Sequence, residues 1–141
     1  MTSHRNDTGS ATVEFIGLAV LLLIPAIYLL VTLSQLQAGG YAAVAAADQA
    51  AKTIGHIDNA AQAERRAMNT VHLTAENYQL DAAATTTVIE CSNSDCTAPG
   101  THISVHVSID VPVPLMPTFF GNPTRIATMN ATGYHVIGEF E

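Results

Sequence analysis

The sequence predicts an α+β fold with a long N-terminal helix, a second helix and a small antiparallel β-sheet. Three observations predict it. Residues 15–33 form an uncharged apolar block, and small and apolar residues continue at helical spacing to about residue 54. A weaker helical pattern follows over residues 59–79. From residue 82 onward, β-branched residues and strict alternation replace the helical period.

The apolar block at residues 15–33 is long enough to cross a membrane. Its only polar side chains are those of Tyr28 and Thr32. A spanning helix needs roughly 17–25 residues, and this block has about 19. Pro25 lies inside it, where we expect a kink of the kind that membrane helices tolerate. An uncleaved anchor and a secretory signal peptide are alternatives, although a signal peptide has an apolar region of only about 7–15 residues.

The predicted helix extends well beyond the apolar block. Alanine, the best helix former, dominates residues 38–51, and Gly55 is a typical helix stop. A single helix over residues 10–54 would be about 67 Å long, so it would project from the membrane into the exported space. Gly39 and Gly40 predict a soft point in this helix, and small residues also permit close packing. One helical face is expected to contain Leu29, Leu33, Leu36, Gly40, Val44, Ala47, Ala51 and Ile54.

A second helix is predicted over residues 59–79, with Asp58 as its N-terminal cap. Arg65 and Arg66 are expected on its solvent-facing side. Contact with acidic lipid is the alternative, although two charges are only a weak anchor. The apolar stripe is weak, since most of its members are alanine and one is acidic: Ala60, Glu64, Ala67, Val71, Ala75 and Tyr78.

The clearest strand signal lies at residues 102–111, where apolar and polar side chains alternate without error. This pattern predicts a half-buried antiparallel strand. Residues 85–90 and 125–137 are expected to pair beside it in a sheet of three or four strands. Pro112 is expected to end the pairing, because proline cannot donate to a ladder. Residues 112–120 are expected either to form a contact surface or to fold over the sheet.

Cys91 and Cys96 are the only cysteines, and the Ser-Asn-Ser-Asp sequence between them is typical of a turn. For an exported chain in an oxidising compartment, this spacing favours a disulfide. Two free thiols are the alternative. A metal site needs more ligands than two cysteines supply, so no metal is expected.

Charge and composition argue against several classes of function. The net charge is −7 and there are five Lys and Arg residues, without the basic stripe that nucleic-acid binding requires. His102 and His106 would lie about 13 Å apart along one strand, too far to share a metal ion. No catalytic constellation or cofactor motif stands out, so we expect neither an enzyme nor a cofactor.

The N-terminal segment carries the most specific motif. A carboxylate at the entrance of an apolar helix needs an explanation, because burial at mid-membrane would cost about 2–3 kcal/mol. The segment reads Gly9-Ser10-Ala11-Thr12-Val13-Glu14-Phe15. Its order of glycine, acid and apolar run resembles the processing site of type IV prepilins. The sequence of the segment is similar to that of the TadE-like pseudopilins of the tight-adherence (Tad/Flp) pilus system. The leader departs from the family pattern, because family leaders are often more basic, whereas here Arg5 is the sole Lys or Arg and is offset by Asp7.

The resemblance implies a minor pilin or pseudopilin that acts in pilus assembly and surface attachment. A prepilin peptidase would cut between Gly9 and Ser10. Glu14, followed by Phe15, would serve processing and assembly. The implied partners are other pilins, the peptidase, an assembly platform with its ATPase, and membrane lipid.

The resemblance also implies a domain organisation and a location. Residues 1–9 would be the leader, residues 10–55 the transmembrane and projecting helix, and residues 56–141 an exported, pilin-like α+β domain. The chain would cross the cytoplasmic membrane once, with its N-terminus in the cytoplasm and its C-terminal domain outside. The competing hypothesis is a membrane-anchored extracytoplasmic binding module unrelated to pili.

Overall fold

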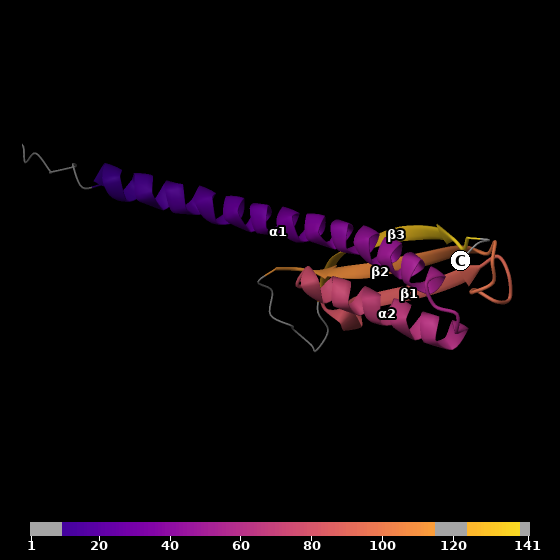
Figure 1. The fold of residues 1–141 in the computed structure, drawn as a ribbon. Helices are drawn as coiled ribbons and strands as arrows, with labels where there is room; N and C mark the ends of the chain where they lie inside the picture. The colour runs from indigo at the N-terminus through magenta and orange to yellow at the C-terminus, as the bar shows by residue number, and fades with distance from the viewer. Residues whose placement is uncertain (1–9, 115–123, 139–141) are drawn as a thin grey trace, which may run out of the picture.

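The computed structural model describes residues 10–114 and 124–138 (Figure 1). These residues form two α-helices, a single 3-10 turn and a three-stranded sheet, so the expected α+β layout is confirmed. In chain order the elements are α1 (Ser10–Gly55), α2 (Ala60–Asn77), η2 (Ala82–Ala84), β1 (Thr85–Cys91), β2 (His102–Pro112) and β3 (Arg125–Val136).

Helix α1 has a free half and a packed half. Figure 1 shows its N-terminal half standing clear of the domain and its C-terminal half lying against the sheet. Residues 11–31 are exposed on all sides, whereas one side of the helix is buried from Gly39 onward. The helix continues through Pro25 and through the glycine pair without interruption. In the described part of the chain, α1 is the one helix long and apolar enough to cross a membrane.

The sheet has the order β1-β2-β3, and both neighbouring pairs are antiparallel. Strand β2 lies in the centre, with Val105 opposite Ile89 on one side and Gly133 on the other. The prediction that Pro112 ends the pairing is wrong by one residue. Pro112 still pairs with Arg125, across an irregularity in the register next to Val111. A proline is tolerated there because the strand ends at this residue.

Helices α1 and α2 cover one face of the sheet, and none of the described elements covers the opposite face, called the open face below (Figure 1). The alternation in β2 decides which side chains fill the space under the helices. The burial pattern of the strand follows the sequence without error, as predicted. The buried members are Ile103, Val105, Val107, Ile109 and Val111.

The predicted stripe on α1 is partly wrong. Val44 is exposed, and Leu29 and Leu33 lie in the free half of the helix. Alanine occurs on every side of this segment, so its spacing did not reveal which side faces the sheet. The buried side of α1 is formed by Ala42, Ala43, Ala46, Ala47, Ala50, Ala51 and Ile54.

The stripe and the cap predicted for α2 also need correction. The cap is Asn59, whose side-chain oxygen accepts a hydrogen bond from the Gln62 amide at 3.0 Å, and not Asp58. Arg65 and Arg66 are exposed, as expected. Ala60, Glu64 and Tyr78 of the predicted stripe are exposed as well. The buried side of α2 consists of Ala63, Ala67, Val71, Thr74 and Ala75.

Two glycines allow α1 to lie directly on the sheet. A Cβ atom at Gly133 in β3 would collide with the backbone of Ala47 and stand 2.7 Å from the amide nitrogen of Asp48. A Cβ atom at Gly39 would stand 2.5 Å from Cγ2 of Val111. The predicted soft point at Gly39 is therefore a place of close packing between α1 and the sheet.

Candidate functional site

The predicted processing segment lies at the free end of α1. Gly9, and with it the expected cleavage site, lies outside the described residues. Ser10 is the first residue of α1. Glu14 and Phe15 lie in the first turns of the helix, in its free half, and both side chains are exposed. Among the residues that the structure describes, none forms a hydrogen bond or ion pair with the Glu14 carboxylate.

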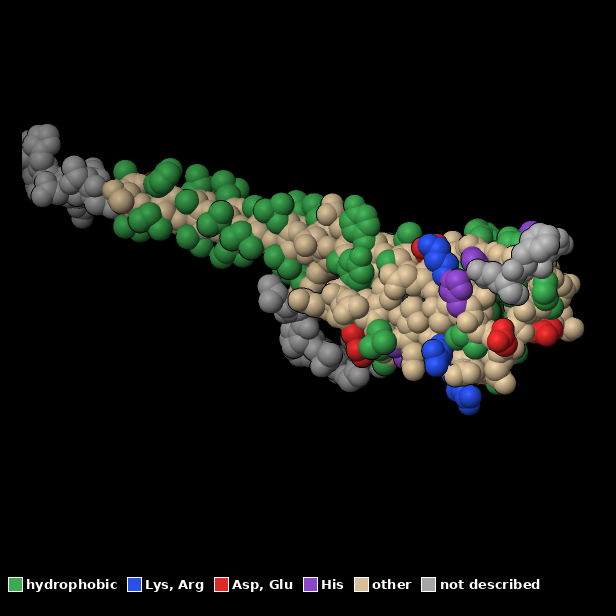
Figure 2. Space-filling model, in the orientation of Figure 1, with side chains coloured by type: hydrophobic (Ala, Val, Ile, Leu, Met, Phe, Trp, Pro, Cys, Tyr) green, Lys and Arg blue, Asp and Glu red, His purple; other side chains and the backbone are tan. Residues whose placement is uncertain are grey.

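The free half of α1 presents apolar side chains on all sides. Figure 2 shows that hydrophobic atoms cover this half, whereas charged groups gather on the domain. Phe15 is 71% exposed, Leu21 69% and Leu30 65%. A water-exposed surface of this kind is unfavourable, and a hydrocarbon layer would cover it. The length and composition of this half are those of a membrane span.

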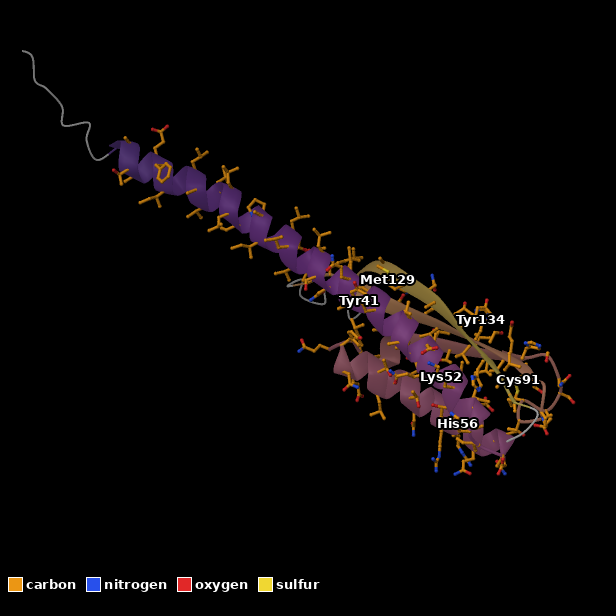
Figure 3. The ribbon with its side chains drawn as sticks, turned by 45° about the horizontal axis from the view of Figure 1, so that its top comes forward. Tyr41, Lys52, His56, Cys91, Met129 and Tyr134 are labelled. Atoms are coloured by element: carbon orange, nitrogen blue, oxygen red, sulfur yellow. A yellow bond between two sulfur atoms is a disulfide. The ribbon has the colours of Figure 1, made fainter. Side chains whose placement is uncertain are left out.

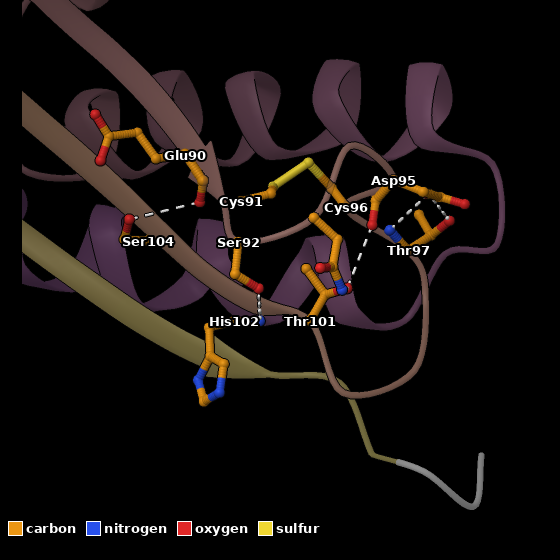
Figure 4. Close-up of a disulfide and its surroundings, with 10 residues drawn as sticks. Glu90, Cys91, Ser92, Asp95, Cys96, Thr97, Thr101, His102 and Ser104 are labelled. Carbon is orange, nitrogen blue, oxygen red and sulfur yellow. Dashed lines mark hydrogen bonds between the residues drawn. A yellow bond between two sulfur atoms is a disulfide. The ribbon is translucent and has the colours of Figure 1, made fainter.

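The disulfide expected from the sequence is present between Cys91 and Cys96, with their Cα atoms 5.4 Å apart. It closes a turn at the end of the domain that is farthest from the free half of α1 (Figures 1 and 3). The Ser92 hydroxyl accepts a hydrogen bond from the backbone amide of His102 at 3.0 Å (Figure 4). The side chain of Asn93 donates to the buried hydroxyl of Thr101 at 3.0 Å. Two neighbouring residues inside the disulfide loop, Ser92 and Asn93, therefore tie the turn to the start of β2.

Asp95 gives this turn its charge. Its carboxylate accepts hydrogen bonds from the Thr97 hydroxyl at 2.6 Å and from the Thr97 amide at 2.9 Å (Figure 4). These two bonds, the hydroxyl first, lower the pKa of Asp95 below its ordinary value of 3.8. The carboxylate is thus ionised at neutral pH.

The open face of the sheet carries a chain of polar side chains across all three strands. His106 lies in the centre, with its Nδ1 2.8 Å from the Thr132 hydroxyl and its Nε2 3.5 Å from the Glu90 carboxylate. An acid, an imidazole and a hydroxyl in series can transfer protons in hydrolases. The side chains of His106 and Glu90 are 43% and 66% exposed, however, so water screens them. We assign this chain of side chains no catalytic role.

The sequence predicted His106 as a solvated histidine but missed both of its partners. Thr132 lies 26 positions away, and only the pairing of β2 with β3 brings it opposite His106. Within the described ranges, no group of three or more His, Cys, Asp or Glu side chains could hold a metal ion.

A shallow hollow of about 300 Å³ lies on the same face, next to the disulfide. Tyr134 lines it and is 73% exposed. The other lining residues are Glu90, Cys91, Ser92, His102, Ile103 and Ser104. The hollow combines an aromatic ring with carboxylate, imidazole and hydroxyl groups, at the end of the domain that would face away from a membrane.

Comparison with protein-family models, with curated proteins and with solved structures finds no match to this chain.

Proposed function

We propose that this protein is a membrane-inserted minor pilin or pseudopilin of the TadE-like kind, and that it acts in assembling a Tad/Flp-type pilus. The proposal rests on the N-terminal motif together with one structural observation. A single helix of 46 residues forms both the apolar segment and the main support of the domain. A subunit that must transmit position from a membrane-embedded end to an exported domain needs such a rigid connection.

The continuity of α1 supports a subunit better than it supports a plain anchor. A plain anchor needs only a tether, and flexible linkers serve that purpose. Here the helix continues from the apolar segment into the domain core, where Ala47 contacts β3 at Gly133. One continuous helix therefore joins the apolar segment to the domain core, without a linker between them.

Glu14 is the residue that carries the assembly role in this proposal. Cleavage after Gly9 would create an amine on Ser10, at a depth in the membrane similar to that of Glu14. A neighbouring subunit shifted along the helix axis would bring its amine to the Glu14 carboxylate. In a medium of low dielectric constant, this attraction offsets much of the cost of burying the charge. The pair would define the axial register between subunits.

The proposal is tested by two variants in the native host. Gly9→Leu should leave the leader attached, so intact mass should show a chain that still begins at the leader, whereas the parent begins at Ser10. Glu14→Ala should insert normally into the membrane but fail to co-isolate with other pilins. Val13→Ala, a change of similar size at an exposed neighbouring position, is the matched control and should behave as the parent. Parent protein that retains its leader, together with normal association and piliation by Glu14→Ala, would overturn the proposal.

A second candidate function is a membrane-anchored extracytoplasmic binding module. The observation that favours it is the hollow beside Tyr134, on the sheet face that the helices leave open. In this case the leader would remain attached, and deletion of the pilus genes would leave binding by the exported domain unchanged. Intact mass of the mature protein distinguishes the two functions directly.

A further inference from the structure

The end of the domain nearest to the free half of α1 lies very close to where a bilayer would end. The apolar block ends at Leu33, and Gly39 is the first buried residue of α1. Six residues of helix rise by about 9 Å. The headgroup layer on each side of a bilayer is about 5–7 Å thick, the difference between the hydrocarbon core and the whole membrane. Gly39 would therefore lie just above the headgroups.

The direction of β3 brings other residues closer still. Ala47 of α1 lies against Gly133, and Gly39 lies near Met129, so β3 approaches the free half of α1 toward its own N-terminal end. Figure 3 shows Met129 beside the point where α1 enters the domain, with Tyr134 farther along the strand. Arg125 comes four residues before Met129, a distance of up to about 13 Å along a strand. This distance is sufficient to bring the start of β3 into the headgroup layer.

The side chains at this end have the chemistry of a membrane interface. Ile126 is 36% exposed, although it is a large apolar residue. The Arg125 guanidinium donates to Asp110 at 2.8 Å, and its side chain is 65% exposed. Tyr41, 68% exposed on α1, also lies near this end, and helical side chains lean toward the N-terminus, which is here the bilayer side. Tyrosine, arginine stems and single apolar side chains are typical of the interface.

The ends of β2 and β3 are held together at this position. The Val113 amide donates to the Thr124 carbonyl at 2.8 Å, and the Thr128 hydroxyl donates to Asp110 at 2.6 Å. Asp110 thus anchors both Arg125 and Thr128. Because Asp110 neutralises Arg125, the contact with lipid would not require an anionic headgroup.

We propose that the β2–β3 end of the exported domain, carrying Arg125 and Ile126, rests in the headgroup layer of the bilayer that holds α1. The inference rests on the proposed membrane insertion and adds a second lipid contact to it. Two contacts, one along α1 and one at the sheet end, would hold the helix at a defined tilt and keep the disulfide end and the hollow beside Tyr134 pointing away from the membrane.

The chain contains no tryptophan, so a single introduced tryptophan is a clean reporter of depth. The full-length protein would be reconstituted in phosphatidylcholine vesicles whose acyl chains are brominated either near the headgroup or near the bilayer centre. Ile126→Trp should lose most of its fluorescence with the shallow bromines and show a blue-shifted emission maximum. Tyr134→Trp, at the far end of β3, should keep its fluorescence. Leu22→Trp, in the middle of the apolar block, should be quenched by the deep bromines.

The controls separate failure of this inference from failure of membrane insertion. If Leu22→Trp is quenched and Ile126→Trp is not, the domain does not rest on the bilayer and the inference is wrong, while membrane insertion stands. If Leu22→Trp is not quenched, α1 is not inserted and the proposed anchoring fails. Thr124→Trp places the reporter at an exposed neighbouring position and is a second test in case Ile126→Trp disturbs the fold. It should also be quenched by the shallow bromines. Adding phosphatidylglycerol should leave the quenching unchanged, and quenching that appears only with anionic lipid would contradict neutralisation by Asp110.

Discussion

The contact between α1 and Gly133 offers the sharpest test of how the helix is joined to the sheet. In Gly133→Ala, the new methyl group would collide with the carbonyl of Ala47 and stand 2.7 Å from the amide nitrogen of Asp48. Both are backbone atoms of α1, so neither can move aside by rotating a side chain. The substitution must therefore push α1 away from β3 at Ala47 and Asp48.

The expected loss of stability follows from two opposing effects. Overpacking a tightly packed site costs about 1–3 kcal/mol, and a backbone neighbour places this site at the upper end. Alanine gains about 0.5–1 kcal/mol over glycine inside a strand. We therefore expect a net loss of about 2 kcal/mol in the free energy of unfolding. For a domain of about 100 residues, this corresponds to a drop of about 8–16 °C in melting temperature.

The assay is thermal unfolding of the full-length protein in detergent micelles, followed by circular dichroism. Gly138→Ala is the matched control, because a Cβ atom there meets nothing within 4 Å. Its melting temperature should equal that of the parent. If Gly133→Ala melts together with Gly138→Ala and the parent, α1 does not lie on β3 as described, and the argument that the helix and the domain form one rigid unit is refuted.

Three further predictions concern other parts of the domain. Gly39→Ala should lower the free energy of unfolding by about 1–2 kcal/mol, because its Cβ would overpack against the sheet. Gly40→Ala should raise the free energy of unfolding by about 1 kcal/mol, because its Cβ meets nothing within 4 Å and alanine is the better helix former. Equal melting temperatures for the two variants would contradict the packing of Gly39 against the sheet. Cys96→Ala should lower the unfolding free energy by about 2 kcal/mol, the chain-entropy value for so short a loop, and a chemical denaturation series that shows no change would argue that the bridge does not form. The carboxyl of Asp95 should titrate below pH 3.8 in an NMR experiment, because the hydrogen bonds from Thr97 lower its pKa. The contribution of these bonds to stability is complete above pH 3.8 and is lost as the pH falls through the lowered pKa. A titration midpoint at or above 3.8 would be inconsistent with the bonds.

Much of the secondary structure could be predicted from local sequence alone. Strand β2 has strict alternation, Gly55 ends α1, and Cys91 and Cys96 lie within reach of one another across a short turn. In β2 and at Gly55, neighbouring residues differ strongly in chemistry, so the pattern supports a single interpretation, whereas for the two cysteines the sequence left free thiols as an alternative. The processing segment around Glu14 is also local in sequence, and its role stays a prediction.

The buried faces of both helices could not be predicted in this way. In α1 the expected face included Val44, yet Ala42 and Ala43 are buried and Val44 is exposed. Hydrophobic periodicity needs contrast between the faces of a helix, and a segment with alanine on every side offers little. The close approach of the sheet selects the face instead, because small side chains allow the backbones to come near one another.

The sequence by itself determined that an apolar helix precedes an α+β domain, where its strands run and which cysteines can pair, because these features depend on residues close together in the chain. The tertiary structure alone decided which glycine accepts the backbone of α1, which partners flank His106, and that the start of β3 points toward the free half of α1. Each of these depends on residues far apart in sequence that meet only through the register of the sheet and the packing of α1 across it.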